Sequence, residues 1–97
     1  MDKNEIKQRL IENKLVIKKD YHVASIGLFG SYVNDEQSLG SDIDFLVEFE
    51  KGYKDFFNYM HLKSYLEELF LMNVDVVMKE AVKERLKERI YGEVEYV

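Results

Sequence analysis

The chain contains no cysteine and no proline, and its only histidines are His22 and His61. Without cysteine it can form no disulfide, and it has no thiolate to act as a metal ligand or nucleophile. Without proline, none of its helices can be kinked by that residue. The two histidines are too far apart in the sequence to indicate a zinc pair.

Positive charge and long apolar runs are also scarce. The chain has 14 Lys and Arg against 19 Asp and Glu, which gives a formal net charge of -5. Because phosphate backbones are bound by basic surfaces, this balance argues against direct nucleic-acid binding. No apolar run approaches the ~20 residues of a membrane span, and the first residues lack the apolar segment of a signal peptide. We therefore expect a soluble cytoplasmic protein without a membrane partner.

The composition is that of a folded domain. Of the 97 residues, 46% are hydrophobic and 13% aromatic, which is enough to build a core. A chain of this size forms one domain, here residues 1–97, and buries roughly 60–65% of its unfolded surface. There is little room for a second domain to close over a substrate. We expect any acceptor site to be shallow or completed by a partner.

Hydrophobic periodicity predicts alternating helices and strands of the α/β (α+β) class, with a small sheet and helices packed against it. The segment 18–20 is expected to be a solvated connection, and the alternating tail 93–97 is too short to assign. The predicted elements are a helix over 4–14, a strand over 23–29, a helical turn over 31–36, a strand over 41–49, a helix over 55–70, a strand over 74–78 and a helix over 80–91.

Gly30-Ser31 stands where the first predicted strand ends. Glycine allows a ligand to approach the backbone closely, and exposed N–H groups at such a turn bind anions. The Ser31 hydroxyl can add a phosphate contact. The alternative for the pair alone is a plain turn in which Ser31 caps the helical turn that follows.

Asp42-Ile43-Asp44 opens the second predicted strand. Successive side chains of a strand alternate between faces, so the two aspartates should share a face with their Cα atoms roughly 6–7 Å apart. Two like charges on an apolar strand are unfavourable unless a cation neutralises them, and oxygen ligands favour Mg²⁺ or Mn²⁺. The alternative places Asp42 at the start of the strand and leaves Asp44 as an outward-facing polar residue.

Asp75 lies alone among valines in the third predicted strand, which could pair beside the second. For Asp75 alone, a structural role and a functional one are equally compatible with the sequence. Three aspartates converging from strands would form a metal-dependent centre for phosphoryl or nucleotidyl transfer. Two metal ions would then neutralise the triphosphate, and Asp75 would help to deprotonate the acceptor hydroxyl.

Two further clusters have simpler explanations. The basic residues of the last predicted helix alternate with glutamates, which favours a solvated helix face; a basic rim for a phosphate is the alternative. The aromatic group at the start of the long helix is expected to be core; contact of its exposed members with a partner is the alternative. These sets are Lys83, Arg85, Lys87 and Arg89, and Tyr53, Phe56, Phe57 and Tyr59.

Three segments together resemble the minimal nucleotidyltransferases, the MNT branch of the DNA polymerase β-like superfamily. A glycine-serine followed at this spacing by Asp-x-Asp, and then by a later strand aspartate, is a specific combination. The similarity covers residues 23–78. The segments are Leu28-Phe29-Gly30-Ser31-Tyr32, Ser41-Asp42-Ile43-Asp44-Phe45-Leu46-Val47-Glu48-Phe49 and Val74-Asp75-Val76-Val77.

The resemblance implies a mixed sheet, with Gly30 and Ser31 on the nucleotide phosphates. Asp42 and Asp44 would be ligands of Mg²⁺, with Asp75 as the third carboxylate and two ions in the site. Small members of the family resemble antitoxins that transfer AMP from ATP to a tyrosine hydroxyl of a HEPN-domain toxin, typically a ribonuclease. The implied partners are therefore ATP and such a toxin, in a hetero-oligomer.

One part of the motif departs from the family. Many relatives continue the glycine-serine with a small residue, arginine and glycine, whereas this chain has Val33-Asn34-Asp35 after Tyr32. A cation expected near the nucleotide is thus absent, and Asp35 adds negative charge. An adenylyltransferase remains the main hypothesis, and a module that neutralises the toxin by contact alone is the alternative. Transfer to a small molecule such as an aminoglycoside is disfavoured because no second domain would hold it.

Overall fold

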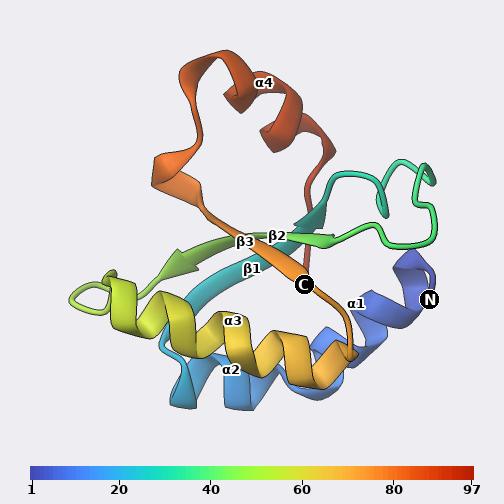
Figure 1. Ribbon diagram of the computed structural model, residues 1–97. Coiled ribbons are helices and arrows are strands. Elements are labelled where there is room, and N and C mark those ends of the chain that lie inside the picture. Colours follow the sequence, from blue (N-terminus) through green and yellow to red (C-terminus); the bar gives the residue numbers. More distant parts are fainter.

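The computed structural model describes residues 1–97 and contains four α-helices, a short 3-10 helix and four strands (Figure 1). None of the helices has the length and apolar character needed to cross a membrane. In chain order the elements are α1 (Lys3–Glu12), α2 (Lys14–Asp20), β1 (Val23–Phe29), β2 (Ile43–Phe49), α3 (Phe56–Phe70), β3 (Val74–Met78), the 3-10 helix η1 (Lys79–Ala81), α4 (Glu84–Glu93) and β4 (Glu95–Tyr96).

The strands form one mixed sheet in the order β3-β2-β1-β4. β1 pairs antiparallel with both β2 and β4, whereas β2 and β3 run parallel. The parallel pair is joined by α3, as a crossover between parallel strands requires. The predicted fold class, a small mixed sheet with helices packed against it, is confirmed.

Helices cover both faces of the sheet unequally. In Figure 1, α1, α2 and α3 lie below the sheet and α4 lies above it. The face toward α1–α3 carries a core of 16 buried residues, whereas the face toward α4 carries a core of four. Alternation along β2 explains the division, because Ile43, Phe45 and Val47 belong to the large core while Leu46 belongs to the small one. The small core consists of Phe29, Leu46, Val82 and Ile90.

Aspartates fix the starts of two helices. Asp2 accepts a hydrogen bond from the Glu5 N–H at 2.9 Å at the start of α1, and Asp55 accepts one from the Asn58 N–H at 2.9 Å at the start of α3. Such caps satisfy N–H groups that have no partner inside the helix. Asp55 therefore precedes the helix in which it was predicted.

Several other boundaries differ from the sequence-based expectation, and the helix predicted over 4–14 ends at Glu12. Residues 18–20 form the end of α2, so the predicted solvated connection is wrong. The second strand begins at Ile43, two residues later than expected. The last helix begins at Glu84 because η1 and a short extended segment precede it.

The tail is part of the sheet, because β4 pairs with β1 at Gly27 and Leu28. A side chain on Gly27 would meet Val94 Cγ2 at 2.6 Å, so glycine lets the tail approach β1 closely. Glu95 also accepts hydrogen bonds from Lys3 and Lys7 at 3.1 and 2.9 Å. The tail therefore connects β1 with α1.

Candidate active site

The Gly30–Ser31 turn follows β1 directly and reverses the chain. Gly30 has φ +80°, and its carbonyl accepts hydrogen bonds from the N–H groups of Val33 and Asn34 at 3.1 and 3.2 Å. The Glu36 N–H donates to the Ser31 carbonyl at 2.8 Å. The segment is thus a hydrogen-bonded turn, as predicted, although it does not extend into a regular helix.

Gly30 is required by space as well as by its backbone angle. Asp44 lies opposite Phe29 in the antiparallel β1–β2 pair. A Cβ added to Gly30 would overlap the Asp44 carboxylate at Oδ2. The turn and the aspartate are therefore in direct contact, and no larger residue fits between them.

Asp44 and Asp75 lie side by side on one face of the sheet. They are register partners in the parallel β2–β3 pair. Their neighbours in sequence, Ile43, Phe45 and Val76 among them, point into the large core, so both carboxylates point to the face covered by α4. The arrangement that the nucleotidyltransferase hypothesis requires, with Asp75 on the same side as Asp44, is present.

Asp42 is placed differently from the expectation. It is exposed and lies one residue before β2, so strand alternation does not determine its direction. The prediction that Asp42 and Asp44 share a strand is wrong in that respect. Asp42 is nevertheless close enough for its charge to act on Asp44.

Asp44 has an unusual acidity. Its pKa is raised from 3.8 to about 6, first by burial and then by the negative charges of Asp75, Asp42 and Glu93, in that order of importance. The backbone N–H of Ser31 acts in the opposite direction. Three like charges therefore surround a half-buried carboxylate, which is unfavourable without a counter-ion.

The donor set suits a hard divalent cation. All candidate ligands are carboxylate oxygens, and none of the salt bridges of the protein involves Asp42, Asp44 or Asp75. No three His, Asp or Glu side chains converge closely enough to form a metal-ion cluster in this arrangement. The assignment of metal ligands to these three aspartates stays a prediction, and it requires the carboxylates to turn toward the ion.

Glu93, at the end of α4, contacts the turn and was not identified from the sequence. Its Oε1 accepts from the Gly30 N–H at 3.1 Å, and its Oε2 accepts from Asn34 Nδ2 at 2.9 Å. The Glu93 carboxylate thus accepts a hydrogen bond from one of the N–H groups predicted to bind phosphate. Nothing local in the sequence indicates this contact, because α4 reaches the turn only through the tertiary fold.

Arg89 was interpreted as part of a solvated helix face, and it is exposed. It also lines a cavity of about 300 Å³ at the turn, here called the turn cavity. The other residues that line the turn cavity are Gly30, Ser31, Asn34, Glu36 and Glu93.

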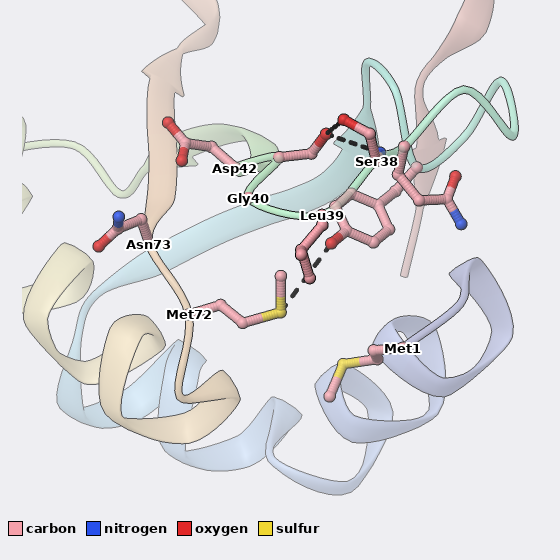
Figure 2. Close-up of a pocket in the computed structure, with 10 residues that line it drawn as sticks. Met1, Ser38, Leu39, Gly40, Asp42, Met72 and Asn73 are labelled. Carbon is pink, nitrogen blue, oxygen red and sulfur yellow. Dashed lines mark hydrogen bonds between the residues drawn. The ribbon is translucent and has the colours of Figure 1, made fainter.

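A second, larger cavity of about 650 Å³, here called the loop cavity, borders Asp42 (Figure 2). Its apolar part is provided by Met1, Tyr32, Leu39 and Met72, and the Tyr32 hydroxyl lies 4.0 Å from Met72 Sδ. Figure 2 shows Asp42 and Asn73 on one side of this cavity and Met1 on the other. The loop cavity therefore offers both polar and apolar side chains to a ligand bound beside Asp42.

Comparison with known proteins agrees with this geometry. The nucleotidyltransferase domain family matches residues 5–97. Protein adenylyltransferase MntA of Thermococcus cleftensis is 38% identical over 93 residues, which cover 96% of this chain and 93% of that protein.

Two solved structures share the fold. One, described as a candidate minimal nucleotidyltransferase, superposes with a TM-score of 0.81 at 30% identity and covers 98% of this chain and 95% of its own. The other is a complex of a tri-AMPylated Shewanella oneidensis HEPN toxin with an MNT antitoxin, with a TM-score of 0.62, 25% identity and coverage of 92% and 70%. The chain therefore belongs to the nucleotidyltransferase domain family, as an enzyme of its minimal, protein-adenylyltransferase branch.

Proposed function

We propose that this protein transfers AMP from ATP to a hydroxyl group, that of a tyrosine on a HEPN-domain toxin, and thereby acts as the antitoxin of that toxin. The observation that carries the proposal is the pairing of Asp44 with Asp75, in register, on the sheet face reached by the Gly30–Ser31 turn. Nucleotidyl transfer needs carboxylates in contact with a turn that can bind phosphate.

The relatives support the choice of substrates. The Thermococcus cleftensis relative is named a protein adenylyltransferase, and the Shewanella oneidensis structure holds an AMPylated HEPN toxin beside an MNT antitoxin. By analogy, the partner of this chain would be a toxin of the same class, bound in a hetero-oligomer.

In the proposed reaction the acceptor oxygen forms a bond to the α-phosphorus of ATP. The bond from that phosphorus to the bridging oxygen of the β-phosphate breaks, and pyrophosphate leaves. Asp75 is exposed beside Asp44, which places it to take up the proton of the acceptor hydroxyl. Gly30 would let the phosphates approach the turn closely, and the Ser31 hydroxyl would help to orient them.

The three aspartates would hold Mg²⁺, and the bound metal would supply charge neutralisation at the phosphates. Asp44 would be the central ligand because its half-buried charge has no cationic partner within the protein.

The direct test uses the product of the neighbouring gene as the candidate toxin. The two proteins are incubated with ATP and Mg²⁺, and the intact mass of the toxin is measured. We expect a gain of one or more AMP units, which Asp42→Asn, Asp44→Asn and Asp75→Asn each reduce by at least ~100-fold in rate. Asp20→Asn, at the end of α2 on the opposite face of the sheet, is the matched control and should retain the rate.

Two results would contradict the proposal. A toxin that is bound and silenced without a change in mass would show that the protein acts by contact alone. Transfer that survives the substitutions at Asp44 and Asp75 would place the chemistry elsewhere.

A further inference from the structure

We propose that Arg89 is the cation that binds the triphosphate of the nucleotide at the Gly30–Ser31 turn. The inference rests on the proposed function and extends it to a residue outside the glycine-serine and aspartate motif. Arg89 comes from α4, whereas the turn comes from the end of β1. The two meet in the turn cavity.

Arg89 is the sole cation that lines the turn cavity. Glu93 follows it by one helical turn, at the spacing where Arg and Glu commonly pair. Here the Glu93 carboxylate is engaged by the Gly30 N–H and by Asn34 Nδ2 instead. Arg89 takes part in no salt bridge, so its guanidinium is free for a ligand.

The chemistry of the turn cavity fits a phosphate-bearing ligand better than a neutral one. Its floor is the Gly30–Ser31 turn, where the Ser31 hydroxyl is available to an anion while the Gly30 N–H donates to Glu93. A guanidinium binds phosphate oxygens through two parallel hydrogen bonds, which a neutral side chain cannot supply. The cavity also contains the carboxylates of Glu36 and Glu93. Without Arg89 its charge would therefore be wholly negative.

The position of Arg89 also accounts for the departure from the family motif. The family resemblance implies an arginine where this chain has Asn34, and the Asn34 side chain donates a hydrogen bond to Glu93. Arg89 lines the same cavity as Asn34 but belongs to α4. A cation lost from the turn is thus replaced by one from a helix distant in sequence.

The test compares Arg89→Gln with Arg85→Gln by calorimetric titration at constant ionic strength. Arg85 precedes Arg89 by one turn of α4, is exposed and does not line the turn cavity. Both substitutions change the net charge equally, so only local contacts distinguish them. The probes are ATP with Mg²⁺, inorganic tripolyphosphate, and adenosine as the phosphate-free control.

We expect Arg89→Gln to weaken binding of ATP and of tripolyphosphate by about tenfold, as loss of a charge-assisted hydrogen bond at an exposed site predicts. Arg85→Gln should stay within about twofold of the unmodified protein, in line with the small effects of exposed charges. Adenosine binding should be the same in all three proteins. Unchanged melting temperatures will show that both variants are folded.

The outcomes separate this inference from the proposed function. Equal affinities of the two variants, in a protein that transfers AMP, overturn the role of Arg89 alone. Arg89-dependent binding of tripolyphosphate, in a protein that transfers no AMP to its partner, retains the phosphate site and overturns the proposed reaction. A protein that binds neither ATP nor tripolyphosphate overturns both.

Discussion

At the residue scale, Gly30 is subject to two independent constraints. Its φ of +80° lies in the left-handed region, which is unfavourable for residues with a side chain. Its Cα also lies against the Asp44 carboxylate. Gly52 shares the first constraint, with φ +93°, but a Cβ there would meet no atom within 4 Å.

The two glycines therefore provide a matched pair of substitutions. We expect Gly52→Ala to lower the free energy of unfolding by about 1 kcal/mol, the cost of a left-handed alanine. Gly30→Ala should lower it by about 2–4 kcal/mol because Asp44 must also move. Only Gly30→Ala should abolish binding of ATP with Mg²⁺. Chemical denaturation and calorimetry measure both effects, and equal losses in the two variants would mean that the Gly30–Asp44 contact is unimportant.

The sequence alone was enough to identify those site residues that stand out within their own segment. Gly30 and Ser31 stand at the end of a strand, where a turn is expected. Asp44 and Asp75 stand inside apolar strands, where a charged residue is unfavourable without a cation. Glu93 and Arg89 could not be assigned in this way. Their neighbours read as an ordinary solvated helix, and only the packing of α4 on the sheet brings them to the turn.

At the scale of elements, the strands and α3 were predictable because their apolar residues follow the periods of 2 and 3.6. α2 was not, since Ile17 is its one buried residue and leaves no periodic stripe. The prediction that the aromatic group belongs to the core was also wrong for Tyr53, Phe56 and Phe57, with 41%, 76% and 69% of their surfaces exposed. Apolar character alone does not specify which side of a helix start faces the protein.

The end of α3 gives a testable prediction. Leu71 terminates the helix in the left-handed conformation, at φ 53° and ψ 38°, and is 86% exposed. Glycine is favoured at this position, and truncation of an exposed side chain removes little packing. Leu71→Gly should therefore raise the free energy of unfolding by about 0.5–1 kcal/mol and the melting temperature by about 3–6 °C.

Leu71→Ala is the control for this prediction. Alanine removes the same exposed surface but keeps the Cβ that disfavours the left-handed conformation. Its melting temperature should stay close to that of the unmodified protein. A gain of the same size in both variants would indicate that the exposed leucine, and not its backbone, limits stability.

At the scale of the whole molecule, the fold assembles negative charge that it does not neutralise. Asp44 lies in β2, and the charges near it are Asp75 from β3, Asp42 just before β2 and Glu93 from α4. Burial and these three charges raise the pKa of Asp44 to about 6. In the folded state Asp44 therefore binds its proton more tightly than in the unfolded chain. The free energy of unfolding should fall as the pH rises from about 4 to about 6, and stay lower above that window.

The contribution of Asp44 can be isolated by comparing the protein with Asp44→Asn, which mimics the protonated form. The pKa shift sets an upper limit of about 3 kcal/mol, and solvent screening of a half-buried group reduces this to ~1–2 kcal/mol. With EDTA at pH 7.5 we expect Asp44→Asn to be more stable by that amount, and the difference to vanish near pH 4. Millimolar Mg²⁺ should stabilise the unmodified protein selectively and reduce its difference in stability from Asp44→Asn at pH 7.5.

Glu68→Gln, which removes an exposed carboxylate without a salt bridge, controls for net charge. A difference that is independent of pH and of Mg²⁺, measured by thermal unfolding, would mean that Asp44 is neither strained by its neighbours nor a metal ligand.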